Sequence, residues 1–141
     1  MEDTKQRVSD LIDLELCAQG VQRAISDENY EQGAAHVHRF LAIDQSLLQQ
    51  TATDVEKISG VLKSMRTLQN ATSQLRAIVK HKFADAIATQ DLHSIERFFK
   101  IFPMIGMHEE GLKDFSSYLC FKVFKILFLK NFDKHQTNMC L

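Results

Sequence analysis

The sequence predicts an all-α fold, an extended array of five or six helices. Proline occurs once and glycine five times in 141 residues, so helix-breaking residues are scarce. Leu, Ala, Gln, Glu and Lys, which are common in helices, are frequent. Apolar residues recur every three or four positions over long segments, which is the period of an amphipathic helix. That period and the capping residues beside it define the individual helices.

The first helix is expected over about residues 5–26. One face of it carries an apolar stripe, the first stripe, with steps of three and four residues: Leu11, Leu14, Ala18, Val21 and Ile25. An apolar stripe has to be covered, and we expect too little chain to be left to cover it. We therefore expect these five residues to be protein-interaction residues that pack against a partner protein or a missing helix of the same chain.

Gly20 lies within this first helix, where glycine costs about 1 kcal/mol relative to alanine. A glycine at such a position indicates either a neighbour that approaches closely or a helix that is locally weak.

The stretch "SDEN", residues 26–29, combines a helix break with good amino-terminal caps, and a second helix is expected from Tyr30. Its apolar face consists of Tyr30, Ala34, Val37, Phe40 and Leu41. The pair of helices weakly resembles one tetratricopeptide unit, although no second copy follows about 34 residues later. A tetratricopeptide-like helical adaptor therefore remains an alternative interpretation.

Residues 44–66 are the least defined part of the pattern, either a loop or a weak helix. A longer helix of about 22 residues, or about 33 Å, is expected from Thr67. Leu75, Val79 and Phe83 belong to its apolar side, and Arg76 is placed on the polar side.

Asp91 is expected to cap a shorter helix that Pro103 ends, because proline removes a backbone donor and restricts the residue before it. We call its end the aromatic corner, which comprises Phe98, Phe99, Phe102 and Pro103. Such a corner usually forms core against the next helix. Replacing Phe99 with alanine is then expected to cost on the order of 3 kcal/mol if Phe99 is buried. The segment "MIGMHEEG" connects to a final helix.

Composition and motifs favour binding over catalysis. Seventeen basic and eighteen acidic residues nearly cancel, so no nucleic-acid partner is expected. His36 and His38 lie two apart and would point about 200° apart on a helix, which disfavours a shared metal ion. His108, Glu109 and Glu110 are interpreted as a solvated helix start. No enzyme activity, cofactor or metal is expected.

Three cysteines at wide spacing, Cys17, Cys120 and Cys140, indicate a reducing compartment rather than a disulfide framework. The polar, acidic start "MEDTKQRVSD" is unlike a secretory signal. The most apolar segment, "FKVFKILFLKNF" at residues 121–132, is shorter than the roughly 20 residues that span a bilayer. No transmembrane helix is expected.

Two blocks of sequence resemble a known family. The first is "RVSDLIDLELCAQGVQRAISDENYEQGAAHVHRFLAID", and the second includes "ERFFKIFP", "GMHEEGL" and "YLC" in that order. Together they cover about residues 7–120 and resemble the amino-terminal region of the conserved oligomeric Golgi complex subunit 4 family. The order of these unusual strings makes the resemblance specific.

The resemblance implies a helical-rod vesicle-tethering scaffold in retrograde intra-Golgi transport and Golgi organisation. It implies peripheral association with the cytosolic face of the Golgi membrane. The implied partners are other subunits of the conserved oligomeric Golgi complex, with Golgi SNAREs, their regulators and Rab proteins as further candidates.

The chain departs from the family after Cys120, where the family continues as a polar helix with lysine and glutamate. We therefore predict a boundary between a helical segment, residues 1–120, and a divergent Phe- and Lys-rich tail, residues 121–141. The tail holds four phenylalanines, and four lysines against one aspartate give it a net charge of +3. One interpretation is an inactive truncated or read-through product, and the other is a basic membrane-surface element, although its lysines do not segregate cleanly onto one face.

Overall fold

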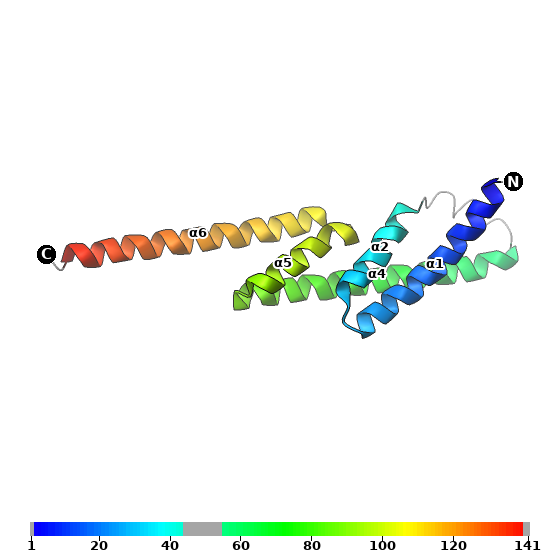
Figure 1. Cartoon of the computed structure of the whole chain (residues 1–141), viewed down its shortest axis with the longest axis horizontal. Coiled ribbons are helices and arrows are strands. Elements are labelled where there is room, and N and C mark those ends of the chain that lie inside the picture. Colours follow the sequence, from blue (N-terminus) through cyan, green and yellow to red (C-terminus); the bar gives the residue numbers. More distant parts are fainter. Residues whose placement is uncertain (1, 44–54, 140–141) are drawn as a thin grey trace. The chain divides into compact units, whose positions relative to one another are not determined.

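The computed structural model describes residues 2–43 and 55–139, with side chains over residues 13–43 and 60–131. Within these ranges the chain forms five α-helices and one 3-10 helix, without a strand, which confirms the all-α prediction. The helices are α1 (Glu2–Ser26), α2 (Tyr30–Ala42), α4 (Val55–Thr89), α5 (Leu92–Ile101) and α6 (His108–Met139), and the 3-10 helix η1 spans Phe102–Ile105 (Figure 1). The chain divides into two compact units, residues 1–108 and residues 109–141.

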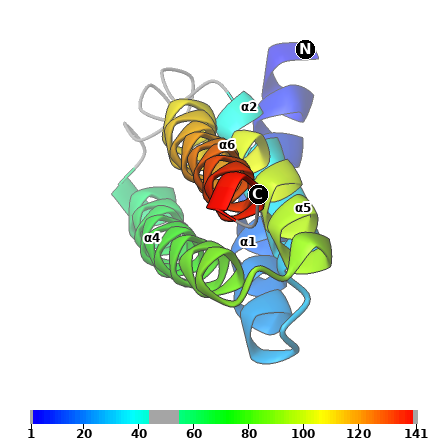
Figure 2. The ribbon, with the colours of Figure 1, turned by 90° about the vertical axis from the view of Figure 1, so that its left-hand side faces the viewer.

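The core of the first unit lies where α1 and α2 pack together and against α4, with α5 and η1 closing one end (Figure 1). An end-on view places α4 and α5 on opposite sides of this unit (Figure 2). Its largest fully buried side chains are Leu14, Val21, Val37, Leu68, Leu75, Val79, Phe83, Ile101, Phe102 and Ile105. Every helix of the unit contributes to this set, so a single shared core holds them together.

Local capping chemistry sets the helix boundaries, as predicted. The side chain of Asn29 accepts a hydrogen bond from the backbone N–H of Gln32 and caps α2. The side chain of Asp91 accepts from the N–H of Ser94 and caps α5. Its hydrogen bonds with Ser94, from the hydroxyl first, lower the pKa of Asp91.

Pro103 acts at the end of α5 as predicted. The α-helix stops at Ile101, and Pro103 occupies the first turn of η1, where a missing backbone N–H leaves no helical bond unmade. Gly106 then ends η1 in the left-handed region with φ of 74°. Glycine adopts this conformation without the Cβ clash of other residues.

The longest helix of the first unit starts at Val55, before the clear apolar pattern that begins near Thr67. Of the two interpretations of this stretch, a loop or a weak helix, residues 55–66 are therefore helical and part of α4. The prediction for residues 44–54 lies outside the described residues. Burial of Leu68, Leu75 and Phe83 confirms the predicted apolar side of this helix.

The second unit consists of the rest of α6, which begins at His108 with Glu109 and Glu110 in its first turn. These acids lie at the positive end of the helix dipole, as expected for a helix start. The helix continues through Cys120 without a break, and the domain boundary at residue 120 stays a prediction. Among the described helices none is both long and apolar enough to cross a membrane.

Candidate protein-interaction site

Three residues of the first stripe lie in the core of this chain. Leu14, Ala18 and Val21 are buried, and α1 packs on α2 and α4. The expectation that too little chain remains to cover the stripe is therefore wrong for these three residues. Ile25 is half-buried, and the side chain of Leu11 lies outside the described residues.

Of the two interpretations of Gly20, the close approach of a neighbour is confirmed, and that neighbour is α2. A Cβ built on Gly20 would lie 2.5 Å from Nε2 of His36, so glycine leaves the space that the imidazole fills. The neighbouring Arg39 Nη2 lies 3.4 Å from both carboxylate oxygens of Asp13 on α1. These contacts join α1 and α2 along one side of the buried stripe.

The aromatic corner divides into buried and exposed members. Phe98 and Phe102 are buried, Phe99 is half-buried and Pro103 is exposed. Phe102 packs edge-to-face on Phe83 of α4, with ring centroids 5.1 Å apart, a favourable geometry for aromatic pairs. Phe98 and Phe102 are thus core residues of the aromatic corner. The predicted cost of Phe99→Ala depended on burial of Phe99, and this condition is only partly met.

Arg97 joins α5 to α2 through both charge and aromatic contacts. Its Nη2 atom lies 3.0 Å from Oε2 of Glu31, and its Nε donates to Oε1 of the same carboxylate. The guanidinium carbon lies 5.1 Å from the ring centroid of Phe98 and 6.0 Å from that of Tyr30. A planar guanidinium suits this combination of a bidentate ion pair and ring stacking better than a lysine would.

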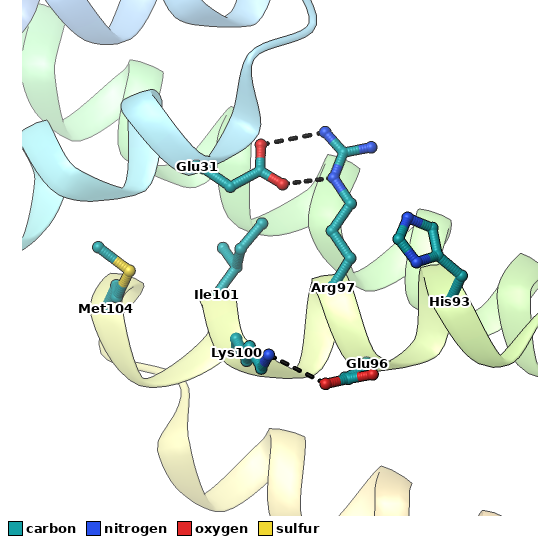
Figure 3. A pocket seen from close by; sticks show the side chains of 7 residues that line it. All are labelled: Glu31, His93, Glu96, Arg97, Lys100, Ile101 and Met104. Carbon is teal, nitrogen blue, oxygen red and sulfur yellow. Dashed lines mark hydrogen bonds and ion pairs between the residues drawn. The ribbon is translucent and has the colours of Figure 1, made fainter.

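A shallow pocket of about 320 Å³ lies beside this ion pair, between α2, α5 and η1 (Figure 3). The residues that line it are Glu31, His93, Glu96, Arg97, Lys100, Ile101 and Met104. Ile101 and Met104 supply an apolar side, and the charged residues surround it. Apolar area inside a polar rim is the usual anatomy of a protein–protein contact.

The charges of the pocket pair with one another. The hydrogen bond from Arg97 lowers the pKa of Glu31, and the same bond raises the pKa of Arg97. Lys100 Nζ lies 3.0 Å from Oε1 of Glu96 one helical turn away, and this hydrogen bond lowers the pKa of Glu96. Such an arrangement presents fixed charges of both signs to a binding partner and supplies no carboxyl with a raised pKa for acid catalysis.

Sequence periodicity missed the role of Arg76. It belongs to the polar side of α4, yet its Nε donates a 2.8 Å hydrogen bond to the backbone carbonyl of Ile105, 29 residues later. The carbonyl is at the end of η1, where helical backbone groups have no internal partner. Arg76 therefore holds the turn next to the pocket in place. In the sequence, only the length and polarity of its side chain indicated that it could reach such a partner.

The described histidines and cysteines form no chemical cluster. His36 is half-buried over Gly20, whereas His38 is exposed. Among the described residues, no group of three or more His, Cys, Asp or Glu side chains could hold a metal ion. Cys17 is buried, and this burial raises the pKa of its thiol, which disfavours the reactive thiolate.

Comparison with known proteins gives two family matches. The family described as "Conserved oligomeric Golgi complex subunit 4, N-terminal" matches residues 1–58. The family described as "COG4 transport protein, middle alpha-helical bundle" matches residues 97–127. No solved structure matches the chain.

Relatives carry the same name across animals and plants. The Drosophila melanogaster "Conserved oligomeric Golgi complex subunit 4" is 49 % identical over 122 residues, which are 86 % of this chain and 16 % of that protein. The Homo sapiens protein of this name is 48 % identical over 84 % of this chain and 15 % of its own length. The Arabidopsis thaliana protein is 34 % identical over 82 % of this chain and 14 % of its own length.

This chain thus spans less than one fifth of the length of these relatives. The two family matches and the relatives agree, and the chain belongs, over the stretch it shares with them, to the conserved oligomeric Golgi complex subunit 4 family.

Proposed function

We propose that this chain is a protein-binding segment of a multisubunit Golgi vesicle-tethering complex that serves retrograde intra-Golgi transport and Golgi organisation. The observation that carries the proposal is 48 to 49 % identity to proteins named for this complex, over 84 to 86 % of the chain. Its partners are other subunits of that complex, with SNAREs, their regulators and Rab proteins as further partners. Its place is the cytosolic face of the Golgi membrane, and its role is binding rather than catalysis.

The pocket between α2 and α5 is the surface that we propose for contact with another subunit. Its apolar side, formed by Ile101 and Met104, is bordered by the paired charges of Glu31 with Arg97 and of Glu96 with Lys100. The buried members of the first stripe support this surface indirectly, because they hold α1 on α2 and α4. Ile25 is the described stripe residue that stays partly accessible to a partner.

Co-purification tests the proposal. The tagged 141-residue chain is recovered from cell extract and probed for the other subunits of the Golgi complex, in wild type and in two charge-reversal variants. Lys100→Glu places a third acid in the pocket beside Glu31 and Glu96, whereas Lys82→Glu makes the same charge change at an exposed position of α4. Recovery of subunits with wild type and Lys82→Glu but not with Lys100→Glu is expected.

Two other outcomes contradict separate parts of the proposal. Equal recovery with both variants would remove the pocket as the contact while leaving the tethering role in place. No recovery with wild type would contradict the binding function of this segment.

A further inference from the structure

We propose that α5 and η1 form a strap that folds as part of the helices before it, and that the helical bundle of this family starts only at α6. The strap comprises residues 92–105. The match to the family's middle helical bundle covers residues 97–127 and so begins inside α5. In the structure, the first compact unit ends at residue 108 and includes the whole strap. This division of the chain goes beyond the proposed binding function and does not depend on it.

Apolar contacts fix the strap in the core of the first unit. Phe102 is fully buried and packs on Phe83 of α4, with ring centroids 5.1 Å apart. Phe98 is buried next to Tyr30 of α2, with ring centroids 6.0 Å apart. Ile105, the last residue of the strap, is also fully buried. Detaching the strap from α2 and α4 would expose all of this apolar area to water, so these elements should unfold together.

Two arginines add polar contacts at both ends of the strap. Arg97 of α5 forms its ion pair with Glu31 of α2, 66 residues earlier in the chain. Arg76 of α4 donates its 2.8 Å hydrogen bond to the carbonyl of Ile105. This carbonyl is at the end of η1, where helical backbone groups lack an internal partner. Each end of the strap is therefore held by a side chain from another helix of the first unit or by a contact with one.

The strap ends in a joint, Gly106 and Met107, that separates it from α6. Gly106 has a φ of 74°, a left-handed conformation that glycine adopts without a Cβ clash. The N–H of Met107 donates a 2.9 Å hydrogen bond to the carbonyl of Phe102 and so closes η1. Helix α6 begins directly afterwards, at His108. The backbone thus ends the strap before the first turn of α6, and the two do not form one continuous helix.

The pocket proposed for a partner subunit then lies wholly in the first unit. Of the residues that line it, Glu31 belongs to α2, Met104 to η1 and all the others to α5. The strap therefore supplies most of the pocket's wall, and none of the lining residues belongs to α6. The pocket should keep its shape when α6 unfolds.

Amide hydrogen exchange of the full 141-residue chain, followed by mass spectrometry, tests the proposal. Leu14→Ala removes a fully buried side chain of α1, and the control Leu16→Ala removes the same atoms at a position that is 57 % exposed. Because the strap shares a core with α1, its slowest amides, within residues 95–105, should exchange at least about 30-fold faster in Leu14→Ala than in the control.

A second pair of variants perturbs α6 instead. Val123→Pro removes a backbone donor inside α6 and breaks the helix, whereas the control Val123→Ala keeps the helical backbone. Exchange in residues 114–131 should be faster in Val123→Pro than in Val123→Ala, and exchange in residues 95–105 should be the same in both. This pair also decides the question if Leu14→Ala does not fold.

Three results would overturn the proposal. Equal exchange of residues 95–105 in Leu14→Ala and Leu16→Ala would show that the strap is not part of the first unit. Faster exchange of residues 95–105 in Val123→Pro would assign α5 to the bundle that contains α6. An equal acceleration of α6 and the strap in Leu14→Ala would show that both unfold as one unit, without a joint between them.

Discussion

Arg97 holds Glu31 by two N–H···O contacts, one of them 3.0 Å long, while its guanidinium lies over the ring of Phe98. The ion pair connects α5 to α2 across 66 residues of sequence. Glu31 and Arg97 are 48 and 39 % exposed, so solvent screens the pair and its contribution should be about 0.2 to 1 kcal/mol.

The first prediction concerns the pH dependence of that pair. Because the hydrogen bond from Arg97 lowers the pKa of Glu31, the folded state holds fewer protons than the unfolded state in the acid range. The stabilisation is therefore present above the unfolded glutamate pKa of about 4.3 and is lost as the pH falls through the lowered folded pKa. Urea unfolding of wild type and Glu31→Gln should differ at pH 7, and the difference should vanish at strongly acid pH.

Glu15→Gln is the control for this measurement, since it removes an exposed carboxylate from α1. A gap between wild type and Glu31→Gln that is constant with pH would show that the carboxylate charge is not what stabilises the contact.

The second prediction concerns the hydrogen bond from Arg76 to the carbonyl of Ile105. Arg76→Met keeps most of the side-chain stem but removes the donor, and a hydrogen bond from a charged group contributes about 1.5 to 3 kcal/mol. Arg66→Met removes the same charge from an exposed position of α4. Chemical denaturation should show a clear loss for Arg76→Met and a small one for Arg66→Met, and equal losses would mean that net charge, not the hydrogen bond, matters.

The third prediction concerns the contact between Gly20 and His36. Gly20→Ala should gain about 1 kcal/mol of helix propensity, but its Cβ would lie 2.5 Å from the imidazole, which then has to turn away, so the net gain should be smaller than about 1 kcal/mol. In a His36→Ala background the clash is absent, and the same substitution should stabilise. A double-mutant cycle of unfolding free energies measures the difference between the two backgrounds, and additive effects would contradict the contact.

Helix ends were predictable because their signals are local. Asn29, Asp91 and Pro103 act on backbone groups within a few residues, and each ends or begins a helix where the sequence placed it. The apolar periodicity likewise identified the face of α4 that carries Leu75. Residues 55–66 stayed open between a loop and a weak helix because their apolar pattern is thin, and the structure has them as the first turns of α4.

Pairing between helices was not predictable in the same way. The period of the first stripe shows that Leu14 and Val21 share a face, but it does not show which helix covers that face. Arg76 was assigned to the polar side correctly, yet its partner lies 29 residues away and depends on how α4 meets η1. Both outcomes depend on contacts between distant segments, which a single-sequence pattern does not contain.

The fourth prediction uses two leucines of α1 that are two positions apart. Leu14 is fully buried and Leu16 is 57 % exposed. Leu14→Ala should cost about 2 to 5 kcal/mol in unfolding free energy, whereas Leu16→Ala should change it by less than about 0.5 kcal/mol. Similar small losses for both variants would mean that the first stripe is not core of this chain and would restore its role as a partner contact.

The fifth prediction uses two phenylalanines of the aromatic corner. Phe102 is fully buried and packs edge-to-face on Phe83, so Phe102→Ala should cost about 3 to 5 kcal/mol through lost contacts and a cavity. Phe99 is half-buried, and Phe99→Ala should cost less because water already reaches part of its ring. The two variants remove the same atoms from the same corner, so thermal or urea unfolding isolates the effect of burial. A larger loss of unfolding free energy for Phe99→Ala than for Phe102→Ala would show that Phe99, rather than Phe102, belongs to the core of the aromatic corner.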